Sequence, residues 1–317
     1  MRTLFVLFAL IVTVSGIPLQ GFAAPHVEQI FSEPALFPLD PEEFFRNLDK
    51  VNTTRFVYGG QEARPGQFPQ HAFMLYKTAE GFFICGASLL SPTHALTAAH
   101  CVEGMMAPSQ IMAGGLNRRD RRAPNAQWRS IHRATKHAEY KPPSKRNDIA
   151  IVEFHPPMTL NRDVQLTKIV EDDAELLQEK KSYVTGFGTY TFKNKQAVTS
   201  DELLWAEIDL FDFSRCQQLW HRRLWQKQIC AGAKNLGAGP GDSGGPLQVL
   251  HDGTLFQVGL TSYGTSDKFD DEFNQDRFPT VFTRVSSYCD FIAKVTDNAA
   301  TCSSLSKKPT AKPDCRF

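Results

Sequence analysis

The chain has 317 residues, of which 42 % are hydrophobic and 22 % are charged, and its formal net charge is +1 at neutral pH. This length and composition suit one sizeable globular domain or two coupled ones. The near-neutral charge gives no support for nucleic-acid binding as the main task, so we expect no nucleic-acid partner.

The N-terminus has the pattern of a secretory signal peptide. Arg2 precedes an apolar run of 11 residues, LFVLFALIVTV (4–14), which is too short to span a bilayer. Cleavage after Gly16 and cleavage after Ala24 both fit, so residues 1–24 are assigned to the signal peptide with both alternatives open. No later stretch approaches 18 apolar residues. We therefore expect a secreted, extracellular and soluble protein without a membrane partner.

Residues 25–56 are typical of a pro-segment rather than of a domain, because they are acidic, carry prolines and show no steady periodicity. The segment contains no cysteine, so we expect it to dissociate once it is cut. Asn52 starts the only N-glycosylation sequon of the chain, Asn52-Thr53-Thr54, and we expect a glycan there.

From Val57 onward, short β-prone runs are separated by Gly, Pro, Asn and Asp, which favours an antiparallel all-β architecture over alternating β-α units. One helix is predicted over residues 288–295, where the apolar side chains share a face. We expect the domain to span 57–298 and a loose basic tail to follow at 299–317. The β-prone runs are 71–78, 82–90, 149–155, 182–187, 203–210, 255–262 and 280–285.

The seven cysteines favour disulfides, because disulfides persist outside the cell. The chain has no CxxC pair, no HExxH motif and no His/Cys cluster with zinc spacing, so we expect no metal and no cofactor. The odd count leaves one thiol that is either free or bonded to another chain. The cysteines lie at positions 85, 101, 216, 230, 289, 302 and 315.

Three segments are interpreted together: LTAAHC (96–101), RNDIAIVEF (146–154) and GPGDSGGPL (239–247). Taken singly, the histidine could be a packed core residue, the aspartate a turn residue and the glycine-rich run a plain loop. That account needs three coincidences in a fixed chain order, and we reject it.

The chemistry explains why these residue types occur together. A serine hydroxyl is a poor nucleophile at neutral pH, so a base must take its proton, and imidazole suits that task. A buried carboxylate fixes the tautomer of the imidazole and stabilises the imidazolium. Backbone N–H groups beside the serine stabilise the developing oxyanion, and flanking glycines allow the required backbone shape.

TAAHC, NDIAIVEF, VTGFG (184–188) and GDSGGP resemble the motifs of the trypsin/chymotrypsin family of serine endopeptidases, and the chain order His, Asp, Ser is that family's order. The resemblance covers roughly residues 57–295. It implies an all-β, chymotrypsin-like fold of two packed six-stranded antiparallel β-barrels with a C-terminal helix. It also implies a zymogen that acts on protein or peptide substrates through an acyl-enzyme, with an activating protease and protein protease inhibitors as partners. We expect a monomer.

Carried over to this chain, the family's catalytic roles fall on a triad and its oxyanion hole. His100 would be the general base, Asp148 its orienting partner and Ser243 the nucleophile. The N–H groups of Gly241 and Ser243 would form the oxyanion hole.

The resemblance also assigns the substrate-binding residues. Ser262, Tyr263 and Gly264 would form the strand that pairs with the substrate backbone, with Tyr263 where the family usually has tryptophan. Gly237, six residues before the nucleophile, would lie at the floor of the primary specificity pocket, where an aspartate selects Lys or Arg. With Gly264 leaving one wall open and Thr280 narrowing the lower part, an uncharged slot predicts chymotrypsin- or elastase-like preference for Phe, Leu, Met or smaller apolar residues.

The insertion SDKFDDEFNQDRF (266–278) lies in the same wall of that pocket. Its five acidic residues are most simply a solvated loop; alternatively, they stabilise a basic residue near the cleaved bond. A family disulfide that would close the pocket is missing, with Gly239 at its first half. The other family bridges imply Cys85–Cys101 and Cys216–Cys230, and we expect Cys289 to pair with Cys302 or, alternatively, Cys315.

Activation in this family frees an apolar N-terminus whose α-amine pairs with the aspartate before the serine, here Asp242. A cut after Arg55 would free Phe56, whereas a cut after Phe56 would free Val57 in the family's register. We favour Val57, which an enzyme with apolar preference could even free by itself.

The loop 116–130 holds one aspartate among several arginines, so we expect no calcium site. The arginines form either a solvated surface, a proteolytic nick site or a site for heparin or acidic partners. The alternative to an enzyme is a non-catalytic, secreted binding module built on the same barrels.

Overall fold

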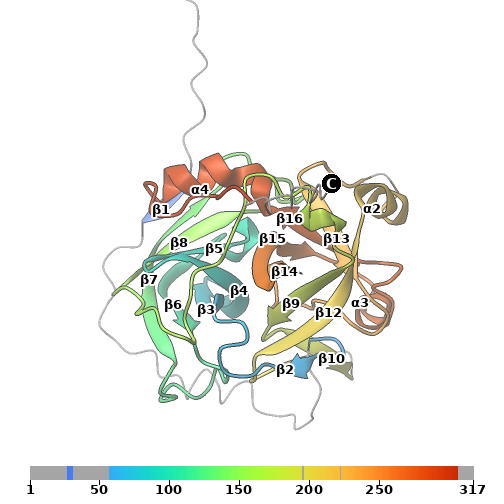
Figure 1. Cartoon of the computed structure of the whole chain (residues 1–317). Coiled ribbons are helices and arrows are strands. Elements are labelled where there is room, and N and C mark those ends of the chain that lie inside the picture. The colour runs from blue at the N-terminus through green and yellow to red at the C-terminus, as the bar shows by residue number, and fades with distance from the viewer. Residues whose placement is uncertain (1–26, 31–56, 195, 222, 306–317) are drawn as a thin grey trace, which may run out of the picture.

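The computed structural model describes residues 27–30, by their backbone alone, and residues 57–194, 196–221 and 223–305. Strands dominate these ranges and form two adjacent barrels, with β3 to β8 in one and β9 and β12 to β16 in the other (Figure 1). The expected features outside the described residues are the signal peptide at 1–24, Asn52, Arg55, Phe56 and Cys315.

The first barrel closes through six antiparallel strands in the order β7-β6-β3-β4-β5-β8, and β8 pairs back with β7. Side chains alternate between the two faces of a strand, so each strand sends every second residue into the barrel, among them Met74, Ile111 and Val152, which are almost fully buried. A seventh strand, β1 (Val27–Ile30), pairs with β7. The six barrel strands are β3 (His71–Thr78), β4 (Gly81–Ser91), β5 (His94–Thr97), β6 (Met106–Ala113), β7 (Gln127–Lys136) and β8 (Ala150–His155).

The second barrel closes in the order β13-β16-β15-β14-β9-β12, with β12 pairing back to β13. Its core includes Val184, Leu247 and Phe282, and also Val57 from the start of the domain. β2 (Gln61–Glu62) extends β12, while β10 (Thr189–Lys193) and β11 (Gln196–Thr199) form a separate hairpin. The barrel strands are β9 (Lys181–Gly186), β12 (Leu204–Phe211), β13 (Gln228–Gly232), β14 (Pro246–His251), β15 (Thr254–Tyr263) and β16 (Thr280–Arg284).

Helices are short in the described part of the chain. α4 (Cys289–Val295) buries Phe291 and Ile292 against Leu90 of the first barrel and Leu260 of the second, so it fastens the two barrels together. α2 (Phe213–Leu219) and α3 (Lys268–Phe273) each start at an aspartate N-cap. None of the helices described here is long and apolar enough to cross a bilayer. The 3-10 turns are η1 (Ala99–Cys101), η2 (Leu176–Gln178) and η3 (Val285–Tyr288).

The expected two-barrel architecture is confirmed, and each of the seven β-prone runs coincides with a strand. The C-terminal helix is also present as α4. Sequence patterns did not predict the other strands, which are β1, β2, β5, β6, β7, β10, β11, β13 and β14, or the helices α2 and α3. The acidic insertion 266–278 is therefore not a simple solvated loop, because it contains α3 and buries Asp271.

Three disulfides hold segments close in sequence: Cys85–Cys101, Cys216–Cys230 and Cys289–Cys302, with Cα–Cα distances of 6.3, 5.8 and 5.6 Å. Those distances suit unstrained bridges. The first bridge ties β4 to the turn that carries His100. The last ties the first residue of α4 to Cys302 at the beginning of the tail.

Candidate active site

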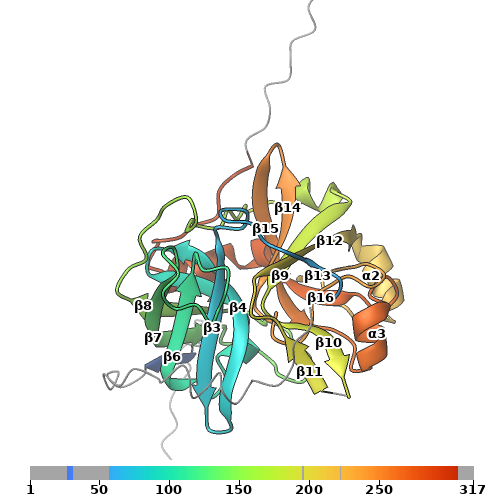
Figure 2. The ribbon, with the colours of Figure 1, turned by 90° about the horizontal axis from the view of Figure 1, so that it is seen from below.

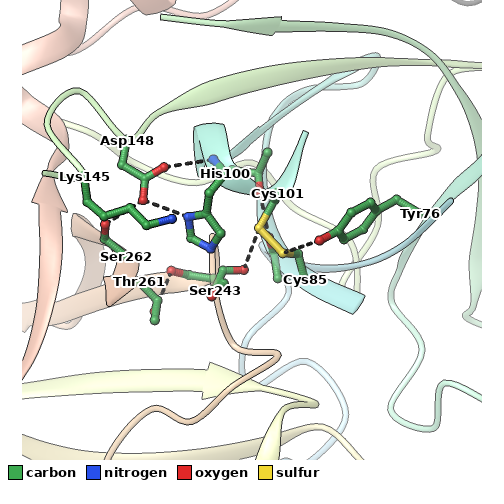
Figure 3. The surroundings of a disulfide bond; sticks show 12 residues. Tyr76, Cys85, His100, Cys101, Lys145, Asp148, Ser243, Thr261 and Ser262 are labelled. Carbon is green, nitrogen blue, oxygen red and sulfur yellow. Dashed lines mark hydrogen bonds and ion pairs between the residues drawn. A yellow bond between two sulfur atoms is a disulfide. The ribbon is translucent and has the colours of Figure 1, made fainter. Parts of the chain in front are cut away.

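The turn η1 follows β5 and carries His100, whereas Asp148 lies two residues before β8. Because β5 and β8 are paired neighbours, these residues meet although they are far apart in sequence. His100 Nδ1 donates to Asp148 Oδ2 at 2.8 Å, and the backbone N–H of His100 donates to Oδ1 at 3.0 Å. The carboxylate thus fixes both the ring and the backbone of His100 (Figure 3).

Asp148 is fully buried, and its environment favours the ionised carboxylate. Burial alone raises its pKa, but the hydrogen bonds and the charge of His100, together with a hydrogen bond from Ser262, bring the pKa below its ordinary value. Ser262 Oγ donates to Asp148 Oδ2 at 2.6 Å. This role of Ser262 was not predicted, since the sequence assigned it only to the substrate strand.

The backbone around Asp148 is held by the C-terminal part of the chain. Asn147 has φ of +55°, and its Oδ1 accepts a hydrogen bond from the hydroxyl of Tyr288 at 3.1 Å. Thr283 Oγ1 donates to the carbonyl of Asp148 at 2.9 Å. Residues of β16 and η3, in the second barrel, therefore position a carboxylate that belongs to the first.

Ser243 enters this site from the glycine-rich turn before β14. Its carbonyl accepts the N–H of Gly86 at 2.8 Å and lies 3.5 Å from the sulfur of Cys101, the residue next to His100. Figure 3 shows the imidazole of His100 between Asp148 and Ser243. The three residues of the expected triad are thus brought together at the junction of the two barrels.

The backbone before Ser243 has the shape expected of an oxyanion hole. Gly241 has φ of +98°, where a side chain would be strained, and a Cβ there would meet Gly188 and Ile84. Within the described residues, the N–H groups of Gly241 and Ser243 donate to no acceptor. Both donors therefore remain available to a ligand.

Asp242, between them, is completely buried. Its carboxylate accepts the N–H of Gly188 at 2.7 Å and that of Gly239 at 2.9 Å. Burial raises the pKa of Asp242 to about 7, although those two hydrogen bonds lower it. No Lys, Arg or His side chain in the described ranges pairs with this carboxylate, so its charge lacks a counterion.

A cavity of about 210 Å³ opens beside Ser243. Its walls include Ser262, Tyr263, Gly264 and Thr280, as expected of a specificity pocket. The cavity is also lined by Asp271 of α3. The pocket wall therefore contains a carboxyl group, which the sequence could not assign because it does not show which insertion residue turns inward.

Arginines of the loop 116–130 form contacts with neighbouring segments and within the loop. Arg118 is 1 % exposed, and its guanidinium donates to Asp201 at 3.1 Å and to Thr199 at 2.9 Å. The guanidinium of Arg121 stacks on Trp128, 4.0 Å from the ring centroid. Two of the arginines expected on a solvated surface are thus part of the packing between this loop and its neighbours.

One cluster of metal-ligand types occurs in the described part of the chain, formed by Cys85, Cys101 and His100. The two sulfurs are bonded to each other, so they cannot serve as thiolate ligands.

Comparisons with known proteins agree with the fold. The chain matches the family model named Trypsin over residues 57–292. It is 30 % identical over 246 residues to chymotrypsin-C of Mus musculus, which covers 76 % of this chain and 89 % of the relative. It is 30 % identical over 253 residues to chymotrypsin-like elastase family member 1 of Rattus norvegicus, with 78 % and 92 % covered, and 29 % identical to that of Homo sapiens, with 78 % and 95 % covered.

The fold and these relatives define a serine protease of the two-barrel class. The chain belongs to the trypsin family.

Proposed function

We propose that the protein is a secreted serine endopeptidase, made as a zymogen, that cleaves peptide bonds through an acyl-enzyme on Ser243. The observation that supports this most is the hydrogen bond from His100 Nδ1 to the buried carboxylate of Asp148. With Nδ1 donating, Nε2 of the neutral ring is an acceptor, and it lies on the side of Ser243 (Figure 3).

The proposed reaction follows from those positions. Ser243 Oγ attacks the carbonyl carbon of the substrate while His100 Nε2 takes its proton, and Asp148 stabilises the imidazolium. The N–H groups of Gly241 and Ser243 donate to the oxyanion. His100 then gives the proton to the leaving amine as the C–N bond breaks. Water attacks the acyl-enzyme with His100 as base, which releases the product and restores Ser243.

Zymogen activation is supported by the unpaired, buried carboxylate of Asp242. The α-amine of a new N-terminus would supply the missing cation. Val57 and Tyr58 are buried, and the ring of Tyr58 lies against Gly239, whose N–H donates to Asp242. This favours cleavage after Phe56, which frees Val57, over cleavage after Arg55.

The organisation we propose keeps the expected boundaries: a signal peptide at 1–24, a pro-segment at 25–56, a protease domain at 57–298 and a tail at 299–317. The pairing of β1 with β7 would place part of the pro-segment on the first barrel. Three disulfides suit an oxidising, extracellular compartment. An activating protease, protein inhibitors, a glycan on Asn52 and a monomeric state belong to the same proposal.

Two substrate classes remain for the pocket. Thr280, which lines the cavity, favours an apolar side chain before the scissile bond, as the sequence predicts, whereas Gly237 is not among the lining residues. The carboxylate of Asp271 favours a cationic one.

Covalent labelling tests the proposed nucleophile. Two variants place a processing site directly before Val57 or directly before Phe56, and each processed protein is treated with a fluorophosphonate. We expect one adduct, mapped to Ser243 by mass spectrometry, in the Val57 form and none in the matched Ser243→Ala protein. Absence of an adduct from both processed forms would overturn the proposal and favour the non-catalytic binding module.

A further inference from the structure

A neutral side chain, Gln275, lies behind the cavity beside Ser243 and is hydrogen-bonded to residues that line it. Gln275 fills the space under Gly237, since a Cβ on Gly237 would lie 1.9 Å from Gln275 Oε1. Gln275 Nε2 donates to the carbonyls of Ala238 and Asp271, both at 2.8 Å, and Thr280 Oγ1 donates to Gln275 Oε1 at 2.9 Å. Any charge in this pocket therefore has to come from its walls.

Asp271 supplies such a charge from α3, which lies beside β10 on the outside of the second barrel (Figure 2). It is 7 % exposed. The hydroxyl of Tyr58 donates to Asp271 Oδ2 at 3.0 Å, which fixes the direction of the carboxylate. Oδ1 lies beside Gly264, where an added Cβ would be only 2.5 Å from it. Glycine at position 264 is thus what allows the carboxylate to lie in the pocket wall.

The charge of Asp271 is not balanced by the protein. Within the described ranges, no Lys, Arg or His side chain forms an ion pair with it, and its one side-chain hydrogen bond, from Tyr58, is on Oδ2. The charges that act on it are also acidic, because Glu272 raises the pKa of Asp271 and Asp271 in turn raises that of Asp242. Buried carboxylates are ordinarily paired, because an uncompensated charge is costly to bury.

We propose that Asp271 is the specificity-determining residue of this pocket and that it selects a substrate whose side chain before the scissile bond is a cation, arginine or lysine. The cation pairs with the carboxylate of Asp271, of which Tyr58 holds only Oδ2. Asp271 does not take part in the reaction itself. The proposal rests on the proposed function only in assuming that the bound cation belongs to a substrate. The cation site itself depends only on the residues that line the cavity.

The test uses the processed, full-length domain with its disulfides and peptides that differ only in the residue before the scissile bond. We expect kcat/KM to be higher for Arg and Lys than for Met and Phe. Asp271→Asn, which can still accept from Tyr58, should lower kcat/KM for the Arg peptide by about 10²-fold and leave the Met peptide almost unchanged. Asp270→Asn is the matched control, because it removes the same charge from α3 at a residue outside the pocket lining.

A binding measurement separates this proposal from the proposed function. Benzamidine, a cation, and benzamide, its neutral counterpart, are titrated calorimetrically into the Ser243→Ala protein with and without Asp271→Asn. We expect benzamidine alone to bind, and Asp271→Asn to abolish that binding while thermal melting shows a folded protein. Preference for Met or Phe peptides, or equal benzamidine binding with and without Asp271, would overturn the cation site. Loss of all cleavage with benzamidine binding intact would overturn the proposed function instead.

Discussion

Two buried carboxylates flank the reacting centre, and their surroundings differ. Asp148 accepts hydrogen bonds from His100, through both its ring and its backbone, and from Ser262. Asp271 accepts one, from Tyr58, and faces a cavity. The pKa of Asp148 is lowered by its partners, whereas burial raises the pKa of Asp271 to about 6, despite the hydrogen bond from Tyr58. Both oxygens of Asp148 therefore have hydrogen-bond partners within the described residues, whereas only one oxygen of Asp271 has such a partner, as expected of a carboxylate that binds a ligand.

The largest effect on catalysis is expected from a change at Asp148. Asp148→Asn should lower kcat by about 10⁴-fold, because the amide no longer fixes the proton of His100 on Nδ1. Steady-state kinetics of the processed protein measure this loss. Ser262→Ala, which removes only one donor to Asp148, is the control and should cost about tenfold or less. Equal losses in the two variants would mean that Asp148 does not orient the base.

Asp242 is a third buried carboxylate, and its proposed partner is the α-amine of the protein's own N-terminus. Asp242→Asn should be processed normally yet remain about 10²- to 10³-fold less active, because the freed α-amine has no buried partner. N-terminal sequencing and a kinetic assay on the same sample separate processing from activity. Full activity of the processed variant would remove Asp242 from activation.

The preference for a cation should depend on pH through Asp271. Its carboxyl is ionised above its pKa of about 6 and protonated below it, so the attraction for Arg is lost as the pH falls. The ratio of kcat/KM for the Arg peptide to that for the Met peptide should fall by about tenfold between about pH 8 and about pH 5. Taking the ratio cancels any effect of pH that is common to both peptides. Tyr58→Phe, which removes the donor to Asp271, should move the fall to higher pH; a flat ratio in the native protein would refute this role of Asp271.

The smallest expected effect is on stability. The free energy of unfolding should change in opposite directions when Asp271 and Asp148 are replaced. Asp271 has a higher pKa in the folded protein than in the unfolded chain, so the stability that its protonated form contributes is lost as the pH rises through about 6. At pH 8, Asp271→Asn should therefore raise the free energy of unfolding by about 1–3 kcal/mol. Asp148→Asn should lower it, because the pKa of Asp148 is depressed by folding. Denaturant titration of both variants checks the signs, and a destabilised Asp271→Asn would contradict the account.

The sequence predicted the triad but not the charge of the pocket, and the reason is physical. His100, Asp148 and Ser243 each lie in a short segment whose residue types serve one chemistry, so local patterns reveal them. Asp271 is one of five acidic residues in the insertion, and its inward direction depends on Tyr58, 213 residues earlier in the chain. No local pattern encodes that contact.

Strand prediction shows the same limit. β7 reads QWRSIHRATK, in which cationic side chains interrupt the alternation, and β6 contains Pro108. Both strands form because their neighbours in the closed barrel pair with them on each side. These two strands therefore depend on pairing within the barrel and cannot be predicted from their own sequence.

A cleavage profile on an unbiased peptide library tests the central claim most directly. The native protein, processed to free Val57, is compared with Ser243→Ala processed in the same way. The account predicts peptide-bond cleavage after Arg and Lys by the native protein and none by the variant. No cleavage by the native protein, or the same cleavage by both, would contradict it.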